Sequence, residues 1–458
     1  MRFVQGSRYL ILSVLLLFMS ASASAQNTTD IAGIWRTEGY AWVFDISSTS
    51  VTAYQVTDAT CVSIIETEDI AYETDSVLLR DVQFPGIAAL LAEPSDVLLT
   101  LAEDVLIFDE GGVVPIHATR IDALPPSCLD GIEDPTDPEA NFEAFWNMFA
   151  ENYAFFDLYG VDWNAVYDTY RPQVNADTSD AELFDILQAT MAGITDAHIN
   201  IIASPIQVFS AGQYAEWTQD QDEEVIAEYV NLIVDNYLID EPQLLANEQI
   251  IYGHLSETVG YINFLSMYEF STDGDDIAAL ESAMATLLAD LSDVETIVID
   301  VRFNPGGADK NAVYIAGYFT DVSTLAFSKQ VWDGETFLEL HDITIEPTAG
   351  EHFSQDVYLL TSNFTTSGGE VFTMAMTALP QVITVGETTQ GAFSDILIVF
   401  PPNGWLVTLS NERYISHDGQ VVESLGILPM IEEPMTSEAL QAGVDPVIDR
   451  VLMLIDGQ

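Results

Sequence analysis

The chain has 458 residues, of which 73 are acidic and 11 basic, so its formal net charge is −62. A field of that sign repels nucleic acid and anionic membranes, and both are therefore excluded as partners. Because 48% of the residues are hydrophobic, the chain is a folded globular protein rather than an acidic disordered one, and its length predicts two or three domains.

The acidic surface itself has two interpretations. Adaptation to salty surroundings is the first, since dissolved ions screen the repulsion between like charges. A calcium-dependent surface is the second, because carboxylates are the ligands that Ca²⁺ prefers. We predict no cofactor, and no Walker pattern or G-x-G-x-x-G loop is present to hold a phosphate.

Residues 1–25 have the pattern of a secretory signal peptide. Arg2 and Arg8 precede an apolar run over residues 9–19. Small residues then lead to a predicted cleavage site after Ala25. The run is too short to span a bilayer, and no later stretch is long and apolar enough to do so. No cysteine follows the signal core to carry a lipid anchor. We therefore expect a secreted or periplasmic protein without membrane insertion.

The two cysteines, Cys61 and Cys128, predict a single disulfide in an exported chain. Such a bond would tie the segment around Cys128 back onto the first domain. A metal site needs more ligands than this pair supplies, so no metal is predicted there.

Residues 26–123 are predicted to form one module, because residues 31–121 alternate apolar and polar side chains with the period of a β-strand, as in "AWVFDIS" and "SVTAYQVT". Turns with Gly, Asp and Ser separate the runs, which predicts a small antiparallel β-barrel-like module. The stretch "GIW" at 33–35 resembles the start of lipocalin-like barrels, but three residues are a weak signal. A closed module used for packing or recognition is the prediction.

The next segments form a lead-in to the remaining chain. Residues 124–141 are rich in Pro and Asp and predict a linker. Residues 142–203 repeat apolar side chains at spacings of three and four, which predicts a helical domain whose aromatic side chains form its core. Residues 204–249 are predicted to be a connecting helical segment.

Residues 250–458 alternate strands and helices, which predicts an α/β domain with a mostly parallel sheet. Two of its strand-to-helix turns contain glycine pairs: Gly306 and Gly307 in one, and Gly368 and Gly369 directly after Ser367 in the other. Ligands collect at the carboxyl ends of parallel strands, and helix N-termini there offer unpaired N–H groups. A hydroxyl on one turn facing amides on the other is an acyl-transfer geometry. The alternative is that Ser367 only caps a helix.

Five motifs in order decide between these interpretations: "IVIDVRFNPGG", "LLTSNFTTSGGEVF", "VITVGETTQGAFSD", "PPNGWLVTLSNERYISHDG" and "VESLGILP". Together they resemble the catalytic domain of the C-terminal processing (tail-specific) peptidases and the tricorn core protease, over roughly residues 140–450. The resemblance implies the ββα-spiral fold shared with Clp proteases and the crotonase group. It also implies Ser367 as the nucleophile, with an oxyanion hole formed by the N–H of Gly368 and that of Gly306 or Gly307.

The same family divides by its catalytic base. The processing peptidases use a lysine in "G-x-x-T-x-G-K-G", where this chain has "GETTQGAF" with Ala392 in its place. Lys310, remote from that position, is the alternative lysine base, because burial can lower the pKa of a lysine enough for it to accept a proton. The tricorn-like branch uses a histidine and a glutamate, and "GITDAHINI" and "VESLGILP" resemble those segments. The resemblance thus implies His198 as base and Glu423 as its orienting partner.

Two neighbours of His198 qualify this assignment. Asp196 lies two residues earlier and can orient the imidazole or stabilise a turn. Ala197 stands where the tricorn core has a serine, so the resemblance implies a triad and not a tetrad.

The predicted function is therefore an exported serine peptidase that acts on peptides or unfolded protein tails through an acyl-enzyme. A non-catalytic carrier of peptides or apolar ligands, as the interphotoreceptor retinoid-binding protein is, remains the alternative on the same fold. Crotonase-like chemistry on acyl thioesters is a third hypothesis, which the secretory signal disfavours. No pattern predicts an oligomer.

Overall fold

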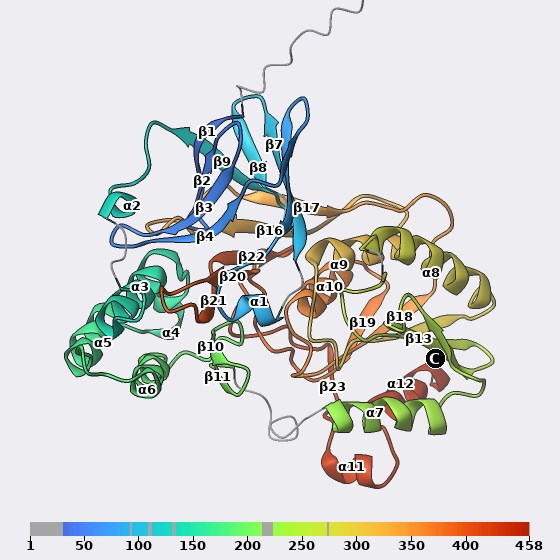
Figure 1. The fold of residues 1–458 in the computed structure, drawn as a ribbon. Helices are drawn as coiled ribbons and strands as arrows, with labels where there is room; N and C mark the ends of the chain where they lie inside the picture. The colour runs from blue at the N-terminus through green and yellow to red at the C-terminus, as the bar shows by residue number, and fades with distance from the viewer. Residues whose placement is uncertain are drawn as a thin grey trace, which may run out of the picture.

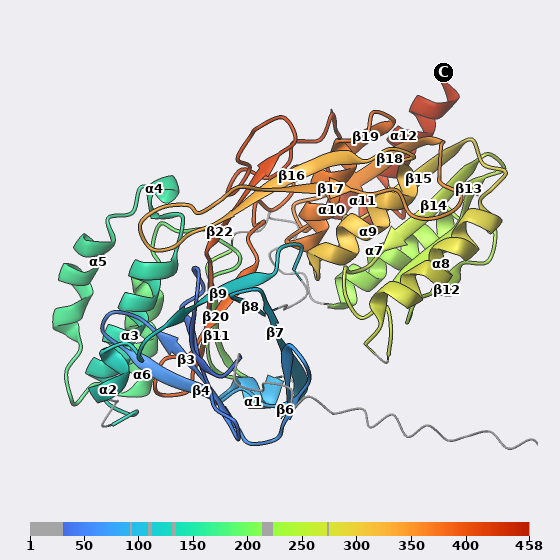
Figure 2. The same cartoon turned by 90° about the horizontal axis from the view of Figure 1, so that it is seen from above.

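A computed structural model describes residues 31–91, 94–108, 112–130, 134–212, 223–272 and 274–457. The predicted signal peptide, residues 1–25, lies outside the described residues. Figures 1 and 2 show three regions: an N-terminal sheet, a group of helices beside it, and a large α/β module. Within the described residues no helix has the length and apolar character needed to cross a membrane.

The N-terminal module is one antiparallel sheet of nine strands, in the order β4-β3-β2-β1-β9-β8-β7-β6-β5. The sheet curls so that it almost closes on itself, with β4 near β6 (Figure 2). Apolar side chains alternate inward and bury the large rings of Trp35, Phe44 and Phe108. The predicted barrel-like module is thus confirmed. Its elements are β1 (Gly33–Thr37), β2 (Trp42–Ile46), β3 (Val51–Val56), β4 (Cys61–Thr67), β5 (Ile70–Tyr72), β6 (Ser76–Val82), α1 (Ala88–Leu91), β7 (Ser95–Ala102), β8 (Val105–Phe108) and β9 (Ile116–Ile121).

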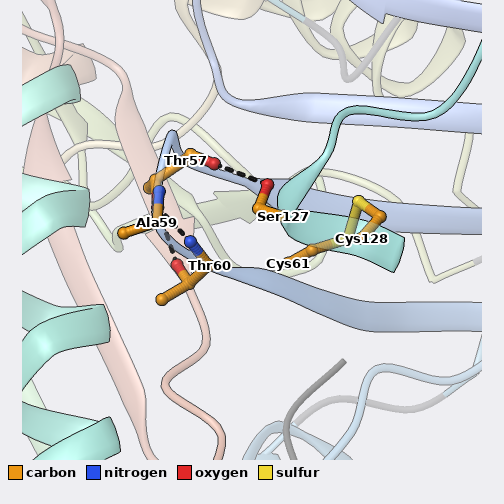
Figure 3. Close-up of a disulfide and its surroundings, with 6 residues drawn as sticks. All are labelled: Thr57, Ala59, Thr60, Cys61, Ser127 and Cys128. Atoms are coloured by element: carbon orange, nitrogen blue, oxygen red, sulfur yellow. Dashed lines mark hydrogen bonds between the residues drawn. A yellow bond between two sulfur atoms is a disulfide. The ribbon is translucent and has the colours of Figure 1, made fainter. Parts of the chain in front are cut away.

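A disulfide joins Cys61 at the start of β4 to Cys128 in α2 (Ser127–Asp130), across 67 residues of sequence. Beside it, the Ser127 hydroxyl donates to the C=O of Thr57 at 2.9 Å (Figure 3). Both contacts fasten the segment that leaves the barrel onto the β3–β4 turn.

The helical region begins earlier than the sequence pattern indicates. Helix α3 starts at Pro138, inside the stretch predicted as a linker, because Asp137 caps it by accepting from the N–H of Glu139 and Pro fits the first turn. Phe145, Phe149 and Trp163 pack in its interior, so these aromatics form a core as predicted. The elements are α3 (Pro138–Asn152), α4 (Phe156–Tyr159), α5 (Trp163–Tyr170), η1 (Arg171–Gln173) and α6 (Asp180–Thr190).

The large module is built on a seven-stranded sheet in the order β12-β13-β14-β15-β18-β19-β23, parallel from β14 onward. Both faces are buried, one under α8, α9 and α10 and the other under α7 and α12 (Figure 1). This confirms the predicted α/β class. The elements are α7 (Glu223–Asn236), β12 (Gln243–Leu245), β13 (Ile250–Ser256), β14 (Val259–Phe264), α8 (Asp276–Asp290), β15 (Thr296–Asp300), α9 (Asp309–Ala316), η3 (Gly317–Phe319), β18 (Asp356–Thr361), α10 (Gly368–Thr377), β19 (Val382–Gly386), β23 (Ile431–Glu432), α11 (Ser437–Gln441) and α12 (Pro446–Asp456).

Two further sheets connect the regions. One has the order β11-β10-β21-β20 and the other β17-β16-β22. The hairpin of β20 and β21 lies within residues 250–458 of the sequence, yet its buried side chains share one core with the barrel and the helices. The Ile87 N–H of the barrel binds the C=O of Gly404 in the hairpin turn at 2.9 Å. The elements are β10 (Asn200–Ser204), β11 (Gln207–Ser210), β16 (Thr324–Val331), β17 (His341–Ile345), β20 (Ile396–Val399), β21 (Leu406–Ser410) and β22 (Glu412–Ser416).

The disulfide gives a stability prediction. The double variant Cys61→Ser/Cys128→Ser should lower the free energy of unfolding by about 2–4 kcal/mol, because the unfolded chain regains the entropy of a long closed loop. Denaturant unfolding followed by circular dichroism measures the loss. The control Ser127→Ala removes only the adjacent hydrogen bond and should cost about 1 kcal/mol or less. Equal losses in the two proteins would contradict the prediction.

Candidate active site

The two glycine turns of the α/β module are in direct backbone contact. They follow β15 and β18, which are adjacent parallel strands with Asp300 paired to Leu360, so both turns lie at the same edge of the sheet. A Cβ atom on Gly306 would lie 2.6 Å from the Cβ of Ser367, and one on Gly368 would lie 2.5 Å from the C=O oxygen of Gly307. Only glycine allows this approach.

Ser367 occupies the N-cap position of α10, but it does not act as a capping side chain. Its hydroxyl makes no capping hydrogen bond, and its backbone has φ 53° and ψ −126°, which a non-glycine residue rarely adopts. Such a conformation costs on the order of 1–3 kcal/mol and is found mainly at functional sites. The Ser367 N–H donates to the C=O of Ala392 at 3.0 Å, which holds the residue in place. The geometry therefore does not support the alternative that Ser367 is only a cap.

The amides around Ser367 divide into bound and free groups. The N–H of Gly306 donates to the side-chain oxygen of Asn304 at 2.9 Å and is therefore engaged. The N–H groups of Gly307 and Gly368 have no hydrogen-bond acceptor among the residues that the structure describes. The Gly307 nitrogen lies 3.0 Å from where a Cβ of Gly368 would be, so the two free amides lie close together. Two adjacent free donors beside a serine fit an oxyanion hole.

Asn304 holds the first turn in register with the second. Besides accepting from Gly306, its side-chain amide donates to the C=O of Phe264 at 2.9 Å, and its own C=O accepts the N–H of Thr366 at 3.1 Å. One residue thus ties the Gly306–Gly307 turn to β14 and to the residue preceding Ser367.

Glu370, fully buried in the first turn of α10, anchors the loop that contacts Ser367. Its carboxylate accepts hydrogen bonds from the Thr389 hydroxyl at 2.5 Å and from the N–H groups of Gly391 and Ala392 at 2.7 and 2.8 Å. Burial raises the pKa of Glu370 to about 7, although these hydrogen bonds oppose the rise. The loop anchored in this way supplies the Ala392 C=O that binds Ser367.

His198 lies just before β10 and is 3% exposed. Its backbone is fixed by two contacts: its N–H donates to Asp196 at 2.8 Å and its C=O accepts from the Thr408 hydroxyl of β21 at 2.5 Å. Burial lowers the pKa of the His198 imidazole, and the charges of Asp196 and Asp395 partly offset this effect. At neutral pH the ring is therefore uncharged and able to accept a proton.

Glu423 lies in a turn before β23 and is 1% exposed. Its Oε2 accepts the N–H of Phe393 at 3.1 Å, one residue beyond Ala392. Burial raises the pKa of Glu423, and the nearby charges of Asp196 and Glu370 raise it further. Asp196 thus affects the pKa of both Glu423 and His198, and all three residues are buried.

No hydrogen bond joins the side chains of the predicted triad in the described part of the chain. Both ring nitrogens of His198 and the Oε1 atom of Glu423 are buried without a hydrogen-bond partner in the described part of the chain. Over the same residues, no hydrogen bond connects Ser367 to His198. Buried polar atoms without partners are rare, because each costs about 1–3 kcal/mol. The imidazole of the predicted base and one carboxyl oxygen of its predicted orienting group are thus available for further hydrogen bonds.

Comparison with family models finds two matches, one of which includes Ser367. Residues 258–433 match the family model described as peptidase family S41, and residues 134–192 match that of the tricorn protease C1 domain. Residues 258–433 form an S41 peptidase domain. The chain is a serine-type peptidase, and the helical lead-in α3–α6 corresponds to the C1 match.

Solved structures agree with this assignment. A candidate peptidase of Parabacteroides merdae is 27% identical, with a TM-score of 0.60 over 70% of this chain and 96% of that chain. CPAF in complex with lactacystin is 12% identical, with a TM-score of 0.53 over 71% of this chain and 99% of that chain. The latter likeness shows a shared fold.

Neither lysine of the chain lies where a processing-peptidase base would be. Ala392 occupies that position. Lys310 is exposed on α9. Lys329 is buried between Asp395 and Glu412, at 2.5 and 2.8 Å, and their negative charges raise its pKa despite burial. A lysine held in its charged form cannot serve as a base.

Sequence reasoning missed the supporting residues Asn304 and Glu370. Glu370 has a signal that could have found it, because it is the one charged residue in a helix whose neighbours are otherwise apolar or small. Asn304 has no such signal, since its role depends on contacts with Phe264 and Thr366, 40 and 62 residues away in sequence.

Glu370 gives a pH-dependent stability prediction. Its pKa is higher in the folded state than the ordinary value of 4.5. Protonation therefore favours the folded state, and this contribution is complete below about pH 4.5 and lost as the pH rises through about 7. The wild-type protein should lose up to ~3 kcal/mol over that window relative to Glu370→Gln, which does not titrate.

Urea unfolding at several pH values between 4 and 8 measures this difference. The control Thr373→Val removes a buried hydroxyl that bonds only to the C=O of Gly369 in the same helix, so it should follow the wild-type pH profile. Parallel profiles for the wild type and Glu370→Gln would show that the prediction is wrong.

Proposed function

We propose that Ser367 is the nucleophile of this peptidase, His198 its general base and Glu423 the group that orients the imidazole. The observation that carries the proposal is the strained, uncapped Ser367 beside two free amides, those of Gly307 and Gly368. The unpartnered atoms of His198 and Glu423 support it, because a triad would satisfy them. The proposal requires that these groups come together during the reaction.

The reaction follows from these roles. His198 takes the hydroxyl proton as the Ser367 oxygen attacks the peptide carbonyl, and the carbonyl oxygen becomes an anion held by the N–H groups of Gly307 and Gly368. The C–N bond then breaks, and the protonated imidazole gives its proton to the leaving amine. Water, activated by His198 in the same way, hydrolyses the acyl-enzyme and restores the serine. In both halves the positive charge on the imidazole favours the ionised form of Glu423, and this carboxylate in turn stabilises the charged ring.

We place Asp196 outside the triad, as a residue that positions His198. One of its oxygens accepts the His198 N–H and the other accepts the Tyr153 hydroxyl at 3.1 Å, so both are engaged. Glu423 keeps a free oxygen, which makes it the better partner for the ring.

We also propose that the protein is exported and acts on peptides or unfolded protein tails. The disulfide supports export, because such bonds persist in oxidising compartments. N-terminal sequencing of the protein from culture medium or periplasm, beginning at Gln26, tests the cleavage site.

The nucleophile is tested by labelling. Ser367→Ala should abolish both peptide hydrolysis and reaction with a fluorophosphonate probe, while its circular dichroism spectrum stays that of the wild type. His198→Ala should reduce turnover by about 10⁴-fold or more, as loss of a triad base does elsewhere. Thr366→Val is the matched control, because the neighbouring hydroxyl binds only the C=O of Phe364. Undiminished labelling of Ser367→Ala would refute the assignment, and a wild-type protein that never labels would favour the carrier hypothesis.

The base is tested by pH. Since His198 must be neutral to accept a proton, kcat/KM should rise with pH and reach half its maximum below pH 6.5, the ordinary imidazole pKa. Asp395→Asn removes one of the charges that raise the pKa of His198, so the midpoint should move to still lower pH. A midpoint above 6.5, or one that Asp395→Asn moves upward, would contradict His198 as the base.

A further inference from the structure

A cavity of about 790 Å³ lies between the barrel and the α/β module. Its size falls within the ~300–1,000 Å³ typical of ligand sites. Trp42, Phe84 and Phe108 of the barrel line one wall, and Ile396 and Ile398 of β20 line the other. The cavity is thus a concave, mainly aromatic and aliphatic space formed jointly by the barrel and the peptidase.

Large apolar side chains remain open to solvent in this cavity. Leu98 on β7 is 49% exposed, Ile396 is 43% exposed and Ile398 is 40% exposed. Burying apolar surface is favourable by roughly 25 cal/mol per Å². An apolar occupant that covers these three side chains would therefore bind with substantial free energy.

Among the described strands, β20 has no partner on its side beside this cavity. It is the last strand of the β11-β10-β21-β20 sheet, and Gln55 of the barrel binds its far end: the side-chain amide donates to the C=O of Ile398, and its oxygen accepts the N–H of Phe400 at 2.8 Å. Alternate residues of an antiparallel strand point their N–H and C=O groups to the same side. The backbone of Ile396 and the N–H of Ile398 therefore face this edge as well.

The side-chain amide of Gln55 binds β20 as the backbone of a neighbouring strand would, with one donor and one acceptor. It covers only one end of the edge, and in the described part of the chain no strand pairs with the Ile396 end. An extended peptide can continue the pairing that Gln55 begins, since open strand edges bind peptides through main-chain hydrogen bonds.

Residues on both sides of the cavity are close in sequence to the candidate active site. Ala308 and Asp309, which line it, directly follow the oxyanion residue Gly307. At the other side, Ile396 is four residues after Ala392, whose C=O binds the Ser367 N–H. Four extended residues span at most ~14 Å, so a peptide on the β20 edge is within a few residues of Ser367.

Charge selects among the peptides that could enter. Four carboxyl groups line the cavity, those of Asp96, Asp309, Asp395 and Glu412, together with one exposed ammonium, that of Lys310. The buried Lys329 pairs with Asp395 and Glu412. This excess of carboxyl groups over the two ammonium groups disfavours acidic side chains, whereas the aromatic wall favours large apolar ones.

We propose that the barrel completes the substrate site of this peptidase: the peptide extends the sheet at β20, and its bulky apolar side chains fill the cavity. This proposal rests on the proposed function at Ser367. It assigns the N-terminal module a role in substrate selection.

Peptide binding to the full-length, disulfide-bonded Ser367→Ala protein tests the proposal without hydrolysis. The probes are blocked nine-residue peptides with a central Phe-Leu-Phe, Phe-Glu-Phe or Gly-Ser-Gly, measured by calorimetry. Phe-Leu-Phe should bind at least about tenfold more tightly than either of the others. N-methylation of the central amides, which removes their donors, should weaken its binding by a similar factor.

Variants at the cavity locate the binding. Leu98→Asn and Ile398→Thr, each in the Ser367→Ala background, should weaken Phe-Leu-Phe binding about three- to tenfold. Both side chains are partly exposed, and Thr retains the strand preference of Ile. Ile239→Thr is the matched control, because Ile239 is 62% exposed on the α/β module and does not line the cavity.

The results separate this proposal from the one before it. Equal binding of the three peptides, or cavity variants that behave like Ile239→Thr, would overturn the substrate site even if the fluorophosphonate labels Ser367. Selective binding that the cavity variants weaken would support the site even if the wild-type protein does not label, in which case only the nucleophile assignment fails.

Discussion

Backbone contact between two glycine turns is the constraint on which the catalytic arrangement depends. Gly306 and Gly307 approach Ser367 and Gly368 so closely that a single Cβ on Gly306 or Gly368 would overlap the opposite turn. Everything near the serine is then positioned relative to main-chain atoms, which move less than side chains. Asn304 and the Ala392 C=O complete this framework with hydrogen bonds to the same turns. The positive φ of Ser367 is the conformational cost of that packing.

Periodicity was enough to predict the local elements but not their assembly. The strands at β15 and β18, the helix after Ser367 and the antiparallel N-terminal sheet follow from runs of neighbouring residues, so they could be predicted. His198 and Glu423 were reached by family resemblance, because no local pattern links residues so far apart. Pairing of β10 with β21 joins residues more than 200 positions apart, and the Gln55 contact with β20 spans 343. Such pairings depend on the whole fold.

Buried charges perform two different tasks in this acidic protein. Arg302, fully buried, binds Asp300 and Asp445 and so fastens the end of β15 to the cap of α12. Its charge is compensated twice, which burial of a guanidinium requires. Glu370 instead has no cationic partner among the residues that the structure describes, and hydrogen bonds from a loop satisfy its oxygens. The first arrangement holds the sheet to its covering helix, while the second holds the loop against the serine.

The β20–β21 hairpin has a consequence for how the chain can be divided. It lies within the residues that match the peptidase family, but its side chains Leu397, Val399 and Val407 complete a core shared with the barrel. A fragment trimmed to the family-matched segment would expose the apolar side chains on one face of that hairpin. It would also lack β10, the strand that pairs with β21 and precedes the segment. The barrel therefore cannot be removed without exposing this shared core, and a shortened enzyme should retain it.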